Sequence, residues 1–315
     1  MNRKWRVLVT GCGGDIGQSI GKILKSKPDL FSLVIGADIH NDHASKFIYE
    51  KCYIISRCSE ERYREDVYNI VNQNNIDVVI PISEPELRLF GLNNYGDSYL
   101  NVPTVLVNQL ALDVGFDKMA TSKFLEKNEL PYPKTYPISR YFEDNFPVLI
   151  KSRNGSGGKS IHVVSNQTEL LSFQNIYPEY IVQEYLDDKD GEFTCGLFRS
   201  SSGEIRDIIF KRKLIGGFSG YGERVENEKV SSVLSKLAIS LNLVGSINVQ
   251  LRIVGETPVI FEINPRFSST VLFRHLMGFE DLIWSIQDKF NLKINCCNLN
   301  LKMNKFYKGF SEYVE

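Results

Sequence analysis

A stretch near the carboxyl end of the chain, residues 245–266, constrains the fold more than any other. Its sequence, GSINVQLRIVGETPVIFEINPR, contains two runs rich in Val, Ile and Phe, at residues 246–253 and 258–263. The residues between the runs, Gly-Glu-Thr-Pro at 255–258, are typical of a turn. The pattern therefore predicts a β-hairpin.

The predicted hairpin gathers oxygen-bearing side chains on one surface. Because side chains alternate across a strand, we expect Glu262 and Asn264 on one face, and Phe261 and Ile263 on the other. Gln250, on the first strand, adds an amide oxygen. Such a set suits Mg²⁺, which takes few protein ligands and fills its shell with phosphate oxygens. The alternative is an ordinary solvated strand face, where most Glu and Asn residues lie.

A second segment, residues 146–163, has features of a phosphate-binding loop. An apolar run ends at Lys151, a loop containing Gly155, Gly157 and Gly158 follows, and a second apolar run begins after it. Glycines let backbone N–H groups approach phosphate oxygens, while a lysine supplies a positive charge. The segment is not a P-loop, because the G-x-x-x-x-G-K-[ST] pattern is absent and a strand follows. By itself it is also compatible with a mobile Gly/Ser hairpin loop.

Two further segments complete an ordered set of motifs. Asp117 and Lys118 open an amphipathic helix, DKMATSKFLEKNEL, which is closed by the breakers in Leu-Pro-Tyr-Pro. A short apolar strand, residues 181–186, runs into the acidic stretch 187–191, and Glu192 follows. In this order the motifs resemble the ATP-grasp superfamily, and they are most similar to the nucleotide-binding halves of the carbamoyl-phosphate synthase large subunit. The resemblance covers most of the chain.

The resemblance implies a set of ATP-binding residues. They comprise the phosphate-contacting lysines, a flexible lid over the triphosphate, an adenine-binding hinge and a ribose-binding acid. The phosphate-contacting lysines are Lys118 and Lys151, and the lid comprises Gly155, Ser156, Gly157 and Gly158. The hinge comprises Glu184 and the backbone of Leu186, and the ribose-binding acid is Glu192.

The resemblance also implies a metal site and a catalytic arginine. Gln250, Glu262 and Asn264 correspond to the metal ligands, with Mg²⁺ as the expected ion and Mn²⁺ as an alternative. Arg266 corresponds to the residue that steadies the transferred phosphoryl group or the acyl phosphate, and with Lys151 it forms the predicted catalytic pair. Many family members carry Asp or Glu where this chain has Gln250, so a second metal ion would bind more weakly. The carbamoyl-phosphate synthase branch has the same Gln, and we do not interpret it as lost activity.

The strand and helix patterns predict an α/β plus α+β protein with the ATP-grasp fold. Residues 1–105 alternate strand and helix, which predicts an amino-terminal Rossmann-like domain with a parallel sheet. Residues 106–186 are expected to form a helix and a small lid subdomain. Residues 187–315 are expected to form an antiparallel-sheet subdomain that carries the metal site, with helices at 227–241 and 270–290.

Composition limits the kinds of binding partner and the cellular compartment that we expect. The contents of 43% hydrophobic and 24% charged residues are ordinary for a globular protein. A net charge of −1 gives no support for nucleic-acid or membrane binding, and no apolar stretch approaches the length of a membrane span. Because the six cysteines form no C-x-x-C pair and a signal-peptide pattern is absent, we expect a cytoplasmic protein with reduced thiols. His40 and His43 are spaced H-x-x-H without a third ligand nearby, and we interpret them as loop residues.

The Gly-rich start of the chain supports an alternative function. Residues 10–17 match T-G-x-x-G-x-x-G, and Asp38 closes the second strand, as in dinucleotide-binding dehydrogenases. Tyr185 and Lys189 match the Y-x-x-x-K pair of short-chain dehydrogenases, but that pair needs a helix and here it follows a strand. An NAD(P)-dependent oxidoreductase is therefore one alternative, and a non-catalytic ATP-binding protein is another.

The expected function is that of an ATP-dependent, ADP-forming ligase. It would join a small-molecule carboxylate to an amine, or to a thiol, through an acyl phosphate. The sequence does not set the oligomeric state and is compatible with a homodimer.

The roles of three features stay open. Arg274 is interpreted either as a ligand for a substrate carboxylate or as an exposed helix residue. The loop 216–222 is expected to border the acceptor pocket, because four glycines suit a closing loop, or else to be a surface turn. Residues 83–86, which include Glu86, follow a strand and are expected to face the site.

Overall fold

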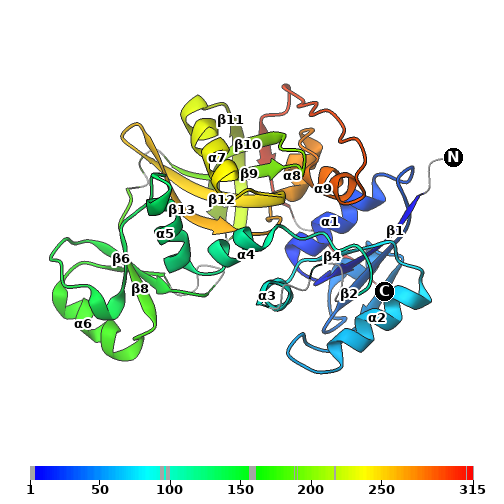
Figure 1. Ribbon diagram of the computed structural model, residues 1–315, viewed down its shortest axis with the longest axis horizontal. Coiled ribbons are helices and arrows are strands. Elements are labelled where there is room, and N and C mark those ends of the chain that lie inside the picture. Colours follow the sequence, from blue (N-terminus) through cyan, green and yellow to red (C-terminus); the bar gives the residue numbers. More distant parts are fainter. Residues whose placement is uncertain are drawn as a thin grey trace.

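The computed structural model of the chain contains three β-sheets that lie side by side along the molecule, with helices packed against each (Figure 1). The described residues are 4–92, 96, 100–155, 161–187, 189, 191–215, 218–309 and 311–314. Ser156, Gly157 and Gly158 of the predicted lid lie outside them. Within the described ranges, no helix combines the length and the apolar character needed to cross a membrane.

The amino-terminal sheet is parallel throughout, as predicted, and its strands have the order β3-β2-β1-β4. Its elements are β1 Trp5–Thr10, α1 Asp15–Lys25, β2 Phe31–Asp38, η1 Ala44–Phe47, β3 Lys51–Ile54, α2 Tyr63–Gln73, β4 Val78–Pro81 and α3 Glu84–Leu92. Alternate residues of β1 enter different cores: Val7 and Val9 pack with residues of α1, and Leu8 packs with residues of α2. Helices therefore cover both faces of the sheet, which is the Rossmann-like arrangement.

A small antiparallel sheet, of strand order β5-β8-β6-β7, lies at the opposite end of the molecule (Figure 1). Its elements, with the two helices that precede them, are α4 Gln109–Gly115, α5 Lys118–Lys127, β5 Thr135–Pro137, η3 Ile138–Arg140, β6 Val148–Ser152, β7 Ile161–Val164, α6 Gln167–Ile176 and β8 Tyr180–Glu184. Helix α5 begins where the sequence predicts, because the Asp117 carboxylate accepts a hydrogen bond from the N–H of Met119 at 2.8 Å and caps the helix.

A six-stranded antiparallel sheet, of order β13-β12-β9-β10-β11-β14, lies between the other two (Figure 1). Its elements are β9 Glu192–Arg199, β10 Ile205–Ile215, β11 Phe218–Val225, α7 Glu228–Ser240, β12 Gly245–Val254, β13 Thr257–Asn264, α8 Val271–Leu276, α9 Asp281–Lys289 and β14 Lys305–Tyr307. Helix α9 joins two cores, since Trp284 packs against the central sheet and Ile283 packs with the amino-terminal sheet. The predicted fold class is thus confirmed, while the domain boundaries after residues 105 and 186 stay predictions.

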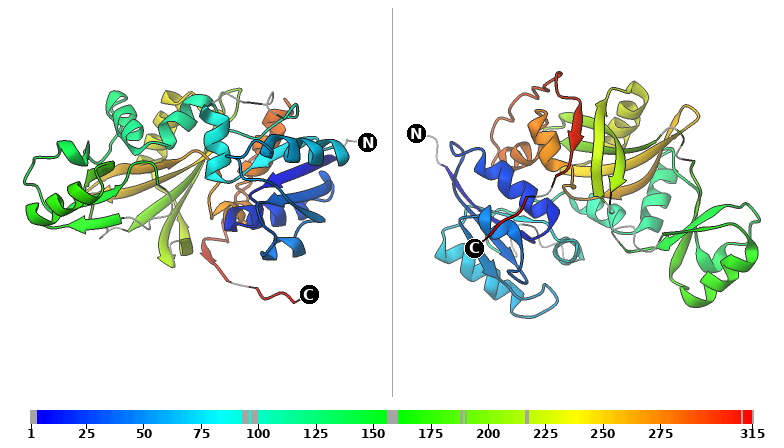
Figure 2. Two further views of the ribbon diagram at one scale, coloured as in Figure 1. Left: turned by 90° about the horizontal axis from the view of Figure 1, so that it is seen from below. Right: turned by 180° about the vertical axis from the view of Figure 1, so that it is seen from behind.

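The carboxyl-terminal tail returns to the amino-terminal sheet after β14 (Figure 2). Lys308 forms an ion pair with Asp15 at the start of α1. Farther along, the ring of Tyr313 stacks on that of Phe47 with 4.8 Å between the ring centres. The tail therefore contacts the amino-terminal part of the chain at the start of α1 and at η1.

Two predictions for the carboxyl-terminal part were wrong. The helix expected over 270–290 is two helices, because Gly278 follows α8 in a left-handed conformation (φ +90°) that ends a helix. Residues 218–222, expected in a closing loop, belong to strand β11. A glycine is needed there for close packing, since a Cβ on Gly222 would lie 2.5 Å from the ring of Phe306. Residues 216 and 217 lie outside the described ranges.

Candidate active site

A cavity of about 1260 Å³ lies where the three sheets meet. Every described residue of the predicted site lines it: Lys118, Lys151, Gly155, Glu184, Leu186, Glu192, Gln250, Glu262, Asn264 and Arg266. Pockets for one small ligand usually measure roughly 300–1,000 Å³. The cavity therefore has room for a nucleotide and a second substrate.

The hairpin that the sequence predicts is formed by β12 and β13. Gln250 lies directly opposite Glu262, and Asn248 lies opposite Asn264. Side chains of directly opposite residues have Cβ atoms roughly 4.5–5.5 Å apart. The predicted oxygen-bearing side chains are therefore neighbours on the cavity wall.

A β-bulge changes one face of this hairpin. The strand register shifts directly after Gln250, which leaves Phe261 without an opposite partner. As a result Phe261 lines the cavity beside Glu262, while Ile260 and Ile263 enter the core. The expectation that Phe261 faces away from Glu262 was wrong, because a bulge interrupts the alternation of side chains.

Arg266 lies beyond the end of β13 and still reaches the site. A tight turn, in which the Arg266 N–H donates to the Asn264 carbonyl at 2.8 Å, redirects the chain there. The guanidinium donates to the Phe267 carbonyl at 2.9 Å and makes a longer contact, 3.5 Å, with the amide oxygen of Asn264. Burial lowers the pKa of Arg266, while the negative charges of Glu84 and Glu262 raise it. The turn thus places a cation between two carboxylates.

Lys151 is a buried cation at the end of β6, with a side chain that lines the cavity. Only 5% of the residue is exposed. Burial lowers the pKa of Lys151 to about 8, against the opposing effect of Glu262, and the nearby Lys118 lowers it further. Among the described residues no carboxylate forms an ion pair with it. Because a buried unpaired charge is unfavourable, this arrangement is typical of a lysine that binds an anionic ligand.

Lys118 connects the start of α5 to the glycine-rich loop. Its Nζ donates to the carbonyl oxygen of Gly155 at 2.6 Å. On the other side, Arg153 donates two hydrogen bonds, at 2.8 and 2.5 Å, to the carboxylate of Asp117. Because an ammonium group has three N–H donors, Lys118 can contact a phosphate and the Gly155 carbonyl at the same time.

The predicted hinge residues lie where β8 ends. The Glu184 side chain is exposed, and its carboxylate accepts a hydrogen bond from the N–H of Lys134 at 3.1 Å. The carbonyl of Leu186 accepts from Arg252 at 2.5 Å. No described residue accepts a hydrogen bond from the N–H of Leu186, which leaves this group for a ligand.

Two arginines that the sequence analysis missed occupy the centre of the site. Glu192 on β9 lies opposite Arg212 on β10 and opposite Arg252 on β12. Its carboxylate accepts two hydrogen bonds from Arg212, at 3.0 and 2.5 Å, and one from Arg252 at 3.2 Å. Arg212 also donates to the amide oxygen of Gln250 at 2.9 Å. The available signal was the basic run 211–213, in which strand alternation turns the middle residue to the opposite face from its exposed neighbours.

The three predicted metal ligands differ in the partners that their oxygen atoms already have. Glu262 is half-buried and forms no ion pair with any residue in the described ranges. The amide oxygen of Asn264 accepts one hydrogen bond, the 3.5 Å contact from the Arg266 guanidinium. Both side chains therefore fit a divalent cation, whereas Gln250 fits one after Arg212 releases its oxygen.

The residues after β4 form the wall on the side of the amino-terminal sheet. All four residues at 83–86 line the cavity. Glu86 is buried, and its carboxylate accepts hydrogen bonds from the hydroxyl groups of Tyr63, at 2.7 Å, and Ser83, at 2.5 Å. Burial raises the pKa of Glu86, and these two hydrogen bonds act against that increase. Glu86 therefore holds residues 83–86 in place through its hydrogen bonds to Tyr63 and Ser83.

Arg88 links this wall to the glycine-rich loop. Its guanidinium pairs with Glu84 at 2.6 Å and donates to the carbonyl of Asn154 at 2.9 Å. It also lies over the ring of Phe116, 4.6 Å from the ring centre. The amino-terminal sheet and the start of the loop are therefore held together on one side of the cavity.

Neither interpretation of Arg274 fits the structure, because its side chain is fully buried behind the cavity. It pairs with Asp281 at 3.1 Å and donates to Asn248 at 2.5 Å and to Ser268 at 3.0 Å. Asn248 and Ser268 themselves line the cavity. Gly196 makes room for the guanidinium, since a Cβ there would lie 2.8 Å from its central carbon. Arg274 therefore holds the cavity-lining residues Asn248 and Ser268 in place and is not positioned to contact a substrate.

Residues 116–270 match the family model described as ATP-grasp domain. The chain contains an ATP-grasp domain. Among its relatives, the carbamoyl phosphate synthase large chain of Methanocorpusculum labreanum is 27% identical over 249 residues, which cover 66% of this chain and 22% of that protein. The coenzyme gamma-F420-2:alpha-L-glutamate ligase of Methanococcus maripaludis is 28% identical over 144 residues, or 39% of this chain and 48% of that protein. The chain thus spans less than half the length of either relative.

Solved structures share the fold over nearly the whole of this chain. An ADP complex of N5-carboxyaminoimidazole ribonucleotide synthetase superposes with a TM-score of 0.75 at 16% identity, and the match covers 95% of this chain and 81% of that one. The L-amino acid ligase of Bacillus licheniformis superposes with a TM-score of 0.70 at 17% identity, covering 91% and 75%. At such identities the likeness establishes the fold.

Proposed function

We propose that this protein is an ATP-dependent, ADP-forming carboxylate–amine ligase that works through an acyl phosphate. The observation that carries the proposal is the convergence of Lys118, Lys151, Glu262, Asn264 and Arg266 on one cavity. The three cations suit the charge of a triphosphate, and the acid and the amide supply oxygen ligands for a divalent ion. The names of two similar proteins, a glutamate ligase and an L-amino acid ligase, support the reaction class.

In this proposal the adenine of ATP lies against the hinge after β8, where the N–H of Leu186 donates to it. Glu192 holds the ribose. Its carboxylate already accepts three hydrogen bonds from arginines, and a carboxylate has about four acceptor sites, so one site stays available for a ribose hydroxyl. The triphosphate then extends towards Lys118 and Lys151, with residues 155–158 as its lid.

Glu262 and Asn264 would hold Mg²⁺, or Mn²⁺ in its place, and Gln250 would join them after separating from Arg212. The ion would supply Lewis-acid stabilisation of the phosphate charge. Because the pair has one carboxylate, we expect its affinity for a free ion to be low and to rise when a nucleotide contributes phosphate oxygens.

The chemistry consists of two displacements. A carboxylate oxygen of the substrate attacks the γ-phosphorus, the bond to the β–γ bridging oxygen breaks, and ADP leaves with the bonding electrons. Lys151 and Arg266 stabilise the charge on the transferred group. The amine nitrogen then attacks the acyl carbon, phosphate leaves, and the nitrogen loses its proton. The wall formed by residues 83–86 borders the space in which the carboxylate and the amine would bind.

The experiment is a product analysis with ATP, Mg²⁺ and a panel of small carboxylates in the presence of hydroxylamine. The expected products are ADP, phosphate and a hydroxamate, since hydroxylamine intercepts an acyl phosphate. AMP and pyrophosphate as products would overturn the mechanism. Tight ATP binding without turnover on any carboxylate would favour the non-catalytic alternative. For the oxidoreductase alternative, Tyr185 and Lys189 lie in no helix of the described residues, and reduction of NAD(P) would be the result in its favour.

A further inference from the structure

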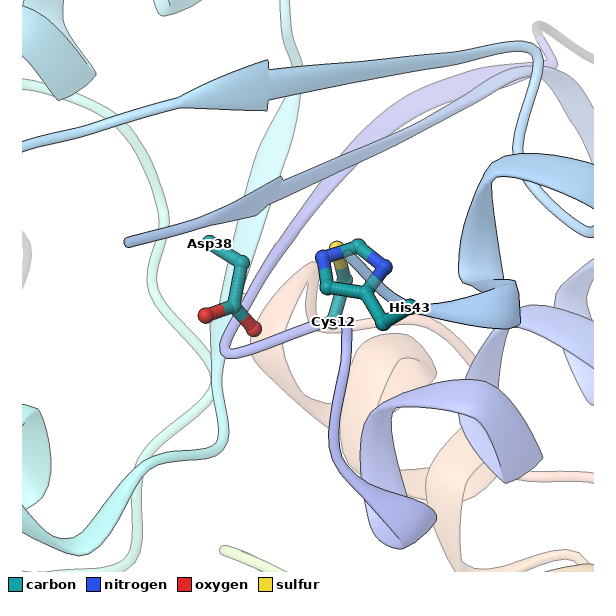
Figure 3. A group of neighbouring side chains, drawn as sticks. All are labelled: Cys12, Asp38 and His43. Carbon is teal, nitrogen blue, oxygen red and sulfur yellow. The ribbon is translucent and has the colours of Figure 1, made fainter. Parts of the chain in front are cut away.

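A second group of side chains with metal-binding chemistry lies in the amino-terminal sheet, at the edge of the cavity. Cys12, Asp38 and His43 each direct one potential ligand atom to the same place, and these atoms lie within 4.8 Å of one another (Figure 3). Cys12 follows β1, Asp38 is the last residue of β2, and His43 precedes η1. The sequence predicts His43 as a loop residue, because its H-x-x-H pair with His40 shows no third ligand nearby.

The backbone at Gly13 brings the three side chains together. Its N–H donates to the Asp38 carboxylate at 2.8 Å. A Cβ at this position would lie 2.4 Å from the ring of His43 and 3.0 Å from the same carboxylate oxygen of Asp38. A residue with a side chain would therefore separate His43 from Asp38, so the glycine is what makes the cluster compact.

Both ring nitrogens of His43 have hydrogen-bond partners, so a metal ion would displace one of them. Its Nε2 lies 2.9 Å from the carbonyl oxygen of His40, which can only accept, so Nε2 carries the proton. In the neutral ring Nδ1 is then unprotonated, and it accepts a hydrogen bond from the hydroxyl of Ser45. The Ser45 oxygen in turn lies 3.6 Å from the sulfur of Cys12. A ligating imidazole commonly has its second nitrogen bonded to a backbone carbonyl in this way.

The charges of the cluster are also those of a cation site. The Asp38 carboxylate accepts hydrogen bonds from the N–H groups of Gly13 and Ile39 and has no cationic partner among the described residues. Cys12 is fully buried, while Asp38 and His43 are half-buried and Asp38 lines the cavity. An ion can therefore enter from the cavity side.

We propose that Cys12, Asp38 and His43 bind Zn²⁺ through the thiolate sulfur, a carboxylate oxygen and a ring nitrogen. A set of one sulfur, one nitrogen and one oxygen ligand suits zinc and does not suit Mg²⁺, which prefers oxygen alone. Binding releases the thiol proton of Cys12 to solvent, and the two negative charges neutralise the ion. Zinc–ligand distances of about 2.0–2.3 Å require ligand atoms roughly 3.3–3.8 Å apart, so the cluster must contract by about 1 Å. The fourth position is left for water on the cavity side.

The ion would join three segments that meet at the cavity: the turn after β1, the end of β2 and the segment that leads to η1. The glycines of this turn, Gly11 and Gly14, line the cavity together with Asp38. Zinc would therefore fix the position of the wall that faces the second substrate in the proposed function. The proposal itself does not depend on that function, because metal binding is measured without ATP.

The test uses the full chain, freed of any affinity tag and kept reduced. Zinc is added, excess is removed by dialysis, and bound metal is measured by elemental analysis. We expect one equivalent in the wild type, at least about a tenfold loss of affinity in His43→Ala, and a comparable loss in Cys12→Ser and Asp38→Asn. The matched controls His40→Ala and Cys296→Ser should keep the full equivalent, since Cys296 is exposed and the His40 side chain is not a ligand.

Substitution with Co²⁺ provides a second readout that does not depend on the stability of the variants. A thiolate-to-cobalt charge-transfer band should be present in the wild type and in His40→Ala, and absent in Cys12→Ser. Zinc should also raise the unfolding temperature of the wild type but not that of His43→Ala. The proposal is overturned if the wild type retains no zinc, if His43→Ala retains as much as the wild type, or if His40→Ala loses as much as His43→Ala.

Discussion

Replacing Lys151 with methionine should make the nucleotide-free protein more stable and at the same time weaken ATP binding. The side chain is 5% exposed, and burial lowers its pKa from 10.5 to about 8. A shift of this size corresponds to about 3 kcal/mol of unfavourable free energy for holding the charged amine in the fold. Methionine has a similar length and no charge, so Lys151→Met should raise the free energy of unfolding at pH 7 by up to this amount.

The pH dependence of this stability change follows from the difference in the pKa of Lys151 between the folded and the unfolded chain. Because the pKa of Lys151 is lower in the folded than in the unfolded chain, the penalty is complete below pH 8 and disappears as the pH rises from about 8 to 10.5. Wild-type stability therefore gains a contribution over this window that Lys151→Met lacks. The two unfolding curves, measured in urea at pH 7 and pH 9.5, should differ most at pH 7.

ATP binding should show the opposite effect. Loss of a charged contact to phosphate should weaken ATP–Mg²⁺ binding by about 10- to 100-fold in calorimetric titration at pH 7. In the wild type the dissociation constant should rise by about fivefold between pH 8 and 9, as the free amine loses its proton, and Lys151→Met should lack this dependence.

The matched control is Lys123→Met, which changes an exposed lysine on α5. It should leave both ATP affinity and stability within the error of the wild type. The reasoning would be refuted by Lys151→Met with unchanged ATP affinity, or by a Lys151→Met protein that is less stable than the wild type without nucleotide.

Three further substitutions test metal binding, phosphoryl transfer and the stability of the fold separately. Glu262→Gln should remove the Mg²⁺ dependence of ATP binding and with it ADP formation; near wild-type ADP release at saturating Mg²⁺ would exclude Glu262 as a ligand. Arg266→Ala should lower the hydroxamate yield by a factor on the order of 10²–10³, as expected for loss of a charge-stabilising donor, and a normal yield would remove Arg266 from the mechanism. Arg274→Met should cost about 3–5 kcal/mol in urea unfolding, because it leaves the buried carboxylate of Asp281 unpaired. Addition of Asp281→Asn should recover part of this loss, and a double variant less stable than Arg274→Met would contradict the explanation.

The elements with strong local patterns could be predicted from the sequence. The hairpin of β12 and β13, the cap of α5 at Asp117 and the strand that ends near Lys151 all occur where the apolar runs and breakers indicate. Among the described residues, the strands that were missed are β3, β5, β11 and β14. β3 has four residues, β5 and β14 have three each, and β11 contains glycines that favour a turn in isolation, so tertiary pairing rather than local preference forms these strands.

Features that depend on register and on long-range packing could not be predicted. The bulge that turns Phe261 into the cavity has no marker in the hairpin sequence. The buried position of Arg274 depends on a partner, Asp281, on the next helix and on the space left by Gly196. Likewise His43 becomes a candidate metal ligand because three separate segments meet at Gly13.

The row of Arg212, Glu192 and Arg252 shows what the sequence motifs leave out around the predicted site residues. Sequence motifs identify the groups that a ligand would touch, and each of those groups needs a partner when no ligand is present. In the structure Arg212 supplies that partner for both Glu192 and Gln250, and Arg252 supplies it for Glu192 and the Leu186 carbonyl. A cation that engages Gln250 would therefore compete with Arg212 for the amide oxygen. It follows that substitution of Arg212 would change both the position of Glu192 and the availability of Gln250, whereas substitution of Arg252 would change the position of Glu192 and of the Leu186 carbonyl.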